Sequence, residues 1–182
     1  MENQTARALT PLFFQKALVE EIKKITSDML FQNPGGEELI KLSVFAQSLP
    51  IPEKKQDVDA REDYQSIEYS VSDTEDAVFN CPWCIVKLGG GSIPEINGYQ
   101  HIEVVIGFGI YNPDKDNRGH EELLNLIQRV YQRFACDPLL DRQYTCRGEF
   151  EWALQDEDTY PYYFGAITTT FKFMGYRREM IY

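Results

Sequence analysis

HIEVVIGFGIY, residues His101–Tyr111, leads through a short polar turn into GHEELLNLIQRVYQRF, residues Gly119–Phe134, and this pair of runs decides the fold. In the first run apolar residues occupy every second position, which predicts a β-strand with one buried face. In the second run they recur every three or four positions, which predicts an amphipathic helix. The predicted buried face of the strand consists of Ile102, Val104, Ile106, Phe108 and Ile110. Its opposite face carries Val105, Gly107 and Gly109, so we expect close packing there as well.

Further strand-like runs lie on both sides of this pair. Cys84–Leu88 precedes it, and Tyr144–Leu154 and Tyr162–Met174 follow it with the alternation typical of antiparallel strands. The order is therefore ββαββ. We predict an α+β fold in which this helix packs on a mostly antiparallel sheet.

The N-terminal part is predicted to add one helix over Leu12–Phe31, ended by Asn33-Pro34-Gly35-Gly36. Glu37–Ala46 has apolar residues three positions apart and is either a short helix or a strand. Pro50–Asp63 is polar, acidic and bounded by proline, so we expect a mobile loop or arm. Tyr64–Val71 alternates and is a further candidate strand.

Length and composition are those of one domain. We expect a single α+β domain over residues 1–182, with the N-terminal helix within 1–36, the mobile loop or arm at 50–63 and the ββαββ core over 79–174. Apolar residues make up 43% and aromatic residues 13% of the chain, enough for a packed core. No apolar run approaches a membrane span, and the first ten residues lack the pattern of a secretion signal, so a cytoplasmic site of synthesis is expected.

The net charge of −11, from 29 acidic and 18 basic residues, disfavours a conventional reader of nucleic acid. Tight DNA binding requires clustered Lys and Arg. An acidic surface is nevertheless compatible with DNA that slides past without adhering.

Cys81-Pro82-Trp83-Cys84 is the motif that most suggests chemistry. A redox CxxC site uses a helix N-terminus to stabilise its thiolate, whereas this motif leads into the predicted strand. A zinc site would combine Cys81 and Cys84 with Cys136 and Cys146, or be completed by His101 or His120. Nine residues separate Cys136 from Cys146, however, unlike the tight pairs of structural zinc sites. We therefore favour buried thiols, and expect no catalytic residue, no metal and no cofactor.

The neighbouring Gly89-Gly90-Gly91-Ser92 could hold phosphate only before a helix, and Ile93-Pro94 follows instead. We predict a flexible connection between two strands.

The order of these elements resembles the tail terminator and tail-completion proteins of long-tailed bacteriophages. The likeness is carried by Trp83–Leu88 before a long loop, by His101–Tyr111 running into the helix Glu121–Phe134, and by the closing hairpin. In that hairpin Glu149–Leu154 leads through Tyr160-Pro161-Tyr162-Tyr163 to Phe164–Phe173.

The resemblance implies a ring, usually a hexamer, that caps the tail tube, stops its growth and presents a docking surface to the head-side connector protein. The partners would be other copies of the chain, the tail tube protein and the connector. DNA would only pass through the lumen. The protein would be made in the host cytoplasm and end in the virion tail.

Ring closure requires two different patches on each subunit. We expect them on the two-sidedly apolar strand and on the aromatic closing hairpin. The candidate interface residues are Ile102, Val104, Ile106, Phe108, Tyr160, Tyr162, Phe171 and Phe173. Two alternatives remain: a generic head–tail or baseplate adaptor, and, in a different class, a zinc-binding or thiol redox protein built on the cysteines.

Overall fold

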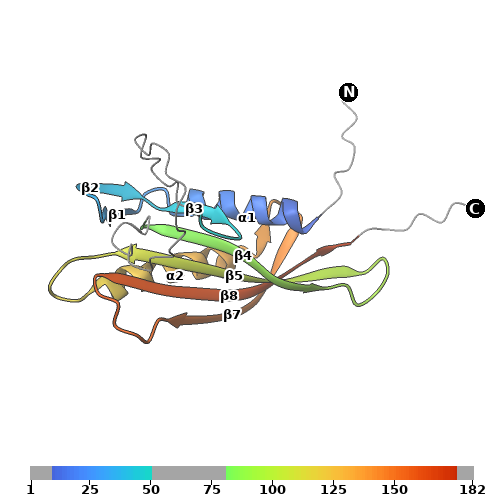
Figure 1. Ribbon diagram of the computed structural model, residues 1–182. Helices are drawn as coiled ribbons and strands as arrows, with labels where there is room; N and C mark the ends of the chain where they lie inside the picture. Colours follow the sequence, from blue (N-terminus) through green and yellow to red (C-terminus); the bar gives the residue numbers. More distant parts are fainter. Residues whose placement is uncertain (1–9, 51–80, 176–182) are drawn as a thin grey trace, which may run out of the picture.

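The computed structural model describes residues 10–50 and 81–175, and these form two helices and eight strands (Figure 1). The predicted strand Tyr64–Val71, and the predicted loop Pro50–Asp63 beyond its first residue, lie outside the described residues. The elements in chain order are α1 (Pro11–Ile25), β1 (Leu30–Asn33), β2 (Gly36–Lys41), β3 (Ser43–Ala46), β4 (Trp83–Ser92), β5 (Tyr99–Tyr111), α2 (Gly119–Cys136), β6 (Leu139–Leu140), β7 (Tyr144–Leu154) and β8 (Tyr162–Met174).

Six strands form one sheet in the order β3-β4-β5-β8-β7-β6. All neighbours are antiparallel except β3 and β4, which are parallel. The central pair is β5 with β8, in unbroken register from Tyr99 opposite Met174 to Tyr111 opposite Tyr162. The predicted α+β class and the ββαββ order are confirmed, and the bounds predicted for β7 and β8 agree with the structure.

Both helices pack against the same face of the sheet. The predicted inner face of β5 is fully or almost fully buried, together with Phe14 and Leu18 of α1 and Leu123 and Leu126 of α2. The core thus lies between one sheet and two helices, where the sequence led us to expect a single covering helix. Neither described helix is both long and apolar enough to cross a membrane.

Aromatic rings join α1 to the sheet. The Phe14 ring lies 4.9 Å from that of Phe171 and 5.2 Å from that of Tyr144, measured between centroids. Phe134 of α2 meets Phe171 edge-on at 5.2 Å. One cluster therefore connects both helices, β7 and β8.

The N-terminal helix is shorter than predicted. Thr10 caps its N-terminus, accepting a hydrogen bond from the Phe13 backbone N–H at 3.3 Å. The helix ends at Ile25 because the hydroxyls of Thr26 and Ser27 donate back to the carbonyls of Ile22 and Lys24, each at 2.8 Å.

The chain beyond the helix forms strands. Asn33 pairs with Gly36, so Asn33-Pro34-Gly35-Gly36 is the turn of the β1–β2 hairpin, a two-stranded sheet of its own. The segment Glu37–Ala46, predicted as helix or strand, belongs to β2 and β3.

The prediction of a flexible connection at Gly89–Ser92 was wrong. These residues continue β4, which pairs with β5 as far as Ser92 opposite His101. The register shifts between Leu88 and Gly90, which is the mark of a β-bulge. Backbone pairing with β5 does not depend on side chains, so the glycines extend the strand, and the β4–β5 hairpin projects well beyond the helices (Figure 1).

We predict that Leu18→Ala, at a side chain with no exposed surface, lowers the free energy of unfolding by about 2–5 kcal/mol because it leaves a cavity between α1 and the sheet. Leu12→Ala is the matched control in the same helix, since Leu12 is 55% exposed, and should cost less than about 0.5 kcal/mol. Urea unfolding of both variants measures the difference. Equal stabilities would contradict the packing of α1.

Candidate functional site

Most of the predicted interface residues lie inside the subunit. The alternation of β5 and β8 was read correctly, but the face it identifies is covered by the subunit's own two helices. Six of the eight candidates are at most 4% exposed: Ile102, Val104, Ile106, Phe108, Phe171 and Phe173. These side chains hold the fold and leave no surface for a neighbouring subunit. Tyr160, 47% exposed, and the half-buried Tyr162 remain at the surface.

The opposite face of the sheet carries no helix within residues 10–50 and 81–175. Its apolar part is built around Trp83, whose ring lies over Gly109 and 6.0 Å from the Phe164 ring. A Cβ on Gly109 would approach the indole to 2.4 Å, so only glycine fits beneath it. The close packing expected at Gly107 and Gly109 is thereby confirmed, with Trp83 as its cause.

The thiols of the Cys81-Pro82-Trp83-Cys84 motif are unsuited to redox chemistry. Cys84 has no exposed surface and Cys81 is 2% exposed. Burial raises the pKa of Cys81 to about 11. Burial raises the pKa of Cys84 still further. Both groups are therefore protonated at neutral pH, whereas redox cysteines act as thiolates.

The four cysteines proposed for zinc do not form a site. Cys136 is exposed at the end of α2, and Cys146 is buried with its sulfur 3.4 Å from the Thr169 hydroxyl. All four belong to the described part of the chain, and there no three His, Cys, Asp or Glu residues are grouped as metal ligands would be.

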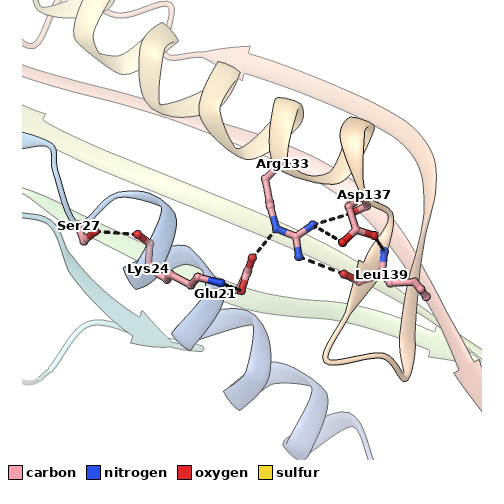
Figure 2. Close-up of polar contacts among 6 residues, drawn as sticks. All are labelled: Glu21, Lys24, Ser27, Arg133, Asp137 and Leu139. Atoms are coloured by element: carbon pink, nitrogen blue, oxygen red, sulfur yellow. Dashed lines mark hydrogen bonds and ion pairs between the residues drawn. The ribbon is translucent and has the colours of Figure 1, made fainter.

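Arg133 holds α1 and α2 together (Figure 2). Its guanidinium pairs with Glu21 of α1 and donates to the backbone carbonyls of Asp137, at 2.6 Å, and Leu139, at 3.1 Å. One turn away, Arg129 donates to the Ile25 carbonyl at 3.0 Å and to Asp28 at 2.6 Å. That contact lowers the pKa of Asp28. The ion pairs and hydrogen bonds of Arg129 and Arg133 hold α2 against α1 and the residues that follow it, so both arginines have a structural role.

The clearest surface for a partner is a groove between α2 and β7, which we call the α2–β7 groove. It encloses about 480 Å³ and is lined by Leu124, Asn125, Ile127, Gln128, Tyr131, Phe150, Trp152 and Ile167. Trp152 is 60% exposed and Tyr131 is 42% exposed, although the Tyr131 ring stands edge-on to Phe150 at 5.2 Å. Two large exposed aromatic residues side by side are typical of protein interfaces.

The groove is bordered by a free strand edge. β6 pairs only with Tyr144 and Thr145, so residues 147–154 of β7 have no strand on their outer side among the described residues. Between Cys146 and Phe150 the register shifts, and Gly148 has a positive φ of 80°. Trp152 and Tyr144 lie on the same face of β7 by strand alternation, yet only Tyr144 is buried. Trp152 is exposed because β6 pairs only with the start of β7, so among the described residues β7 is the outermost strand at Trp152, which the sequence pattern does not reveal.

Comparisons with known protein families and with curated proteins find no match for this chain.

We predict one fast-reacting thiol per chain in the folded protein, that of Cys136, because the other three cysteines are buried. Titration with a disulfide reagent at pH 8 measures it. Cys136→Ser should abolish the fast phase, and denaturant should then release three thiols. A fast phase that survives this substitution would contradict the burial of the motif.

We also predict that Gly109→Ala destabilises the fold by about 1–3 kcal/mol, because the new methyl group collides with the Trp83 ring. Gly90→Ala in β4 is the matched control, since no atom lies within 4 Å of its added Cβ. It should change stability by less than about 0.5 kcal/mol. Thermal unfolding compares the two, and a neutral Gly109→Ala would show that Trp83 does not cover this glycine.

Proposed function

We propose that the protein is a phage structural protein that forms a ring on the end of the tail tube, ends its polymerisation and gives the head-side connector a surface to dock on. The observation that carries the proposal is a sheet with two different edges, neither of which is paired with a further strand among residues 10–50 and 81–175. One edge is the four-residue strand β3, and the other is the free part of β7.

Unlike edges favour a head-to-tail arrangement. A contact between two different surfaces repeats from subunit to subunit and closes into a ring when the rotation is right. Figure 1 shows β3 on one side of the subunit and β7 on the other, so neighbours could attach on both sides at once. A hexamer is the ring size that the resemblance to tail terminators implies.

The charge of the chain suits a lumen through which DNA passes. With a net charge of −11 per subunit, the assembled ring would repel the phosphate backbone and not retain it. The projecting β4–β5 hairpin bears the exposed apolar side chains Ile93 and Ile96, 62% and 80% exposed, and offers a contact for the tail tube protein or the connector.

An assembly role also agrees with the chemistry of the motif that most suggested an enzyme. Its two cysteines are buried and protonated, and Pro82 between them is buried as well. We therefore place these residues in support of Trp83 and not in catalysis.

The proposal predicts that purified protein added to growing tail tubes of the matching phage stops their elongation and is found at one end of each tube. Tube length in electron micrographs measures the first effect, and gold-labelled protein the second. Replacing an early codon of the gene by a stop codon should give tubes of unregulated length.

Tubes that grow unchanged and carry no label at their ends would contradict a terminator. Protein found at the head–tail junction or baseplate without any effect on tube length would instead support the generic adaptor.

A further inference from the structure

The open edge of β7 presents a row of backbone groups to its outer side. The Gln155 backbone N–H donates to the Phe164 carbonyl at 2.9 Å, one step beyond the register pair of Leu154 with Gly165. In an antiparallel pair, residues that bond across the two strands alternate with residues whose N–H and C=O point the other way. Counting back from Gln155, every second residue of β7 therefore directs its backbone groups to the open side, where no strand pairs among residues 10–50 and 81–175. These residues are Phe150, Trp152 and Leu154.

The two faces beside this open edge differ in chemistry. On the helix side lies the α2–β7 groove, to which Phe150 and the exposed ring of Trp152 belong. On the opposite side lie the exposed carboxylates of Glu149 and Glu151, because neighbouring residues of a strand point to opposite faces. Three further exposed acidic residues follow in the loop after β7: Asp156, Glu157 and Asp158. The edge thus separates an apolar face from an acidic one.

Together these features specify the chemistry of the chain that the edge would bind. Backbone groups in a row bind an extended strand, and pockets beside the edge select its alternate side chains. Apolar side chains at every second position fit the groove, and Lys or Arg at the positions between them fit the acidic face. Arg147 lies 3.7 Å from Glu149, whereas Glu151 has no ion-pair partner within the part of the chain that the structure describes.

We infer that the open edge of β7 binds a β-strand of a different protein, which pairs antiparallel with residues 150–154 and alternates apolar side chains toward the groove with basic side chains toward Glu151. The antiparallel direction is slightly more stable per residue than the parallel one. The other edge strand of a second copy does not have this chemistry, because β3 contains no Lys or Arg. The added strand also covers an edge that is otherwise open to aggregation.

This inference goes beyond the proposed ring, because it concerns a chain of another protein. In a ring, the added strand would extend the sheet of one copy toward its neighbour on the β7 side. Strand binding is measured on the separate subunit, so its test does not require the ring to form.

A synthetic peptide serves as the probe. The heptapeptide KVKLKVK, blocked at both ends, places Val and Leu on one face of an extended strand and Lys on the other. We expect saturable one-to-one binding in calorimetry at about 0.15 M salt. Two control peptides should bind at least about tenfold more weakly. In EVELEVE carboxylates replace the ammonium groups, and in KKVLVKK the same residues no longer alternate.

Methylation of single backbone nitrogens shows whether the peptide pairs with the edge. In the antiparallel register the apolar residues of the peptide lie opposite Phe150, Trp152 and Leu154 and direct their N–H groups to β7. N-methylation of the central Leu should therefore weaken binding about tenfold or more. N-methylation of the Lys beside it is the matched control, because that N–H points away from β7, and should leave the affinity unchanged.

Variants of the protein test the two faces of the edge. Trp152→Ala should weaken binding of KVKLKVK about tenfold or more, and Glu151→Gln about twofold to fivefold. Glu95→Gln is the matched control for charge, because it removes an exposed carboxylate from the β4–β5 hairpin, and should leave the affinity unchanged. All three side chains are exposed, so the melting temperature of the free protein should stay the same in each variant.

Each outcome supports or overturns the inference. No saturable binding up to about 1 mM peptide, equal binding of EVELEVE, or full affinity of the peptide methylated at Leu would overturn it. Self-association that Trp152→Ala abolishes and the peptide does not displace would show that a second copy occupies the edge, and would overturn it as well. A subunit that ends tube growth without binding the peptide would leave the terminator proposal standing alone. A subunit that binds the peptide as described and does not act on tubes would leave only the strand-binding edge.

Discussion

The contact of Phe14 with Phe171 and Tyr144 is the interaction on which the rest of the architecture depends. It fixes α1 on the sheet, and the position of α1 fixes the N-terminal strands. Gln15, the next residue, is buried and donates to the Val86 carbonyl at 2.8 Å and to the Gln47 side chain at 3.0 Å. Leaving the buried Gln15 amide without a partner would cost about 1–3 kcal/mol. These two hydrogen bonds therefore hold β4 and the end of β3 in a fixed position relative to α1. The parallel β3–β4 pair, and with it one edge of the sheet, follows from the docking of a helix that lies outside the ββαββ core.

Covering one face of the sheet with two helices decides where a partner can bind. The inner side chains of β5 and β8 are fully engaged by α1 and α2, so they cannot serve two subunits at once. The remaining surfaces are the sheet edges, the projecting hairpins and the face around Trp83. Edges present unpaired backbone groups in a fixed direction, and natural proteins rarely leave them long and uncovered without a purpose. Because the inner face is filled within one chain, any partner would have to bind at one of these surfaces.

Periodicity in the sequence predicts the central elements because burial there is regular. β5 and β8 alternate strictly, and α2 keeps its apolar stripe from Leu123 to Phe134, so all three could be recognised without tertiary information. The end of α1 could not, because Met29 continues the helical spacing of Ile22 and Ile25 although the helix ends at Ile25. The pairing of Gly90 and Gly91 with β5 was equally hidden, since backbone bonds and not side chains extend β4. For the interface, alternation identifies a buried face but not whether the chain itself or a neighbour covers it. Only the position of α1 in the structure shows that the chain itself covers this face. The candidate surface for a partner is therefore at the β7 edge and not on the inner face of β5.

Electrostatics constrains how any such assembly is held together. Each copy would bring a net charge of −11, so every subunit added to the proposed ring would be repelled by those already in place, and an ion pair at an exposed edge recovers less than about 1 kcal/mol. The favourable free energy would have to come from short-range burial of apolar surface, and Trp152 and Tyr131 of the α2–β7 groove are large exposed side chains that offer it. Salt screens the long-range repulsion more strongly than it weakens a buried apolar contact. If the proposed ring forms, its subunits would stay apart when dilute and would assemble where the end of a tube raises their local concentration.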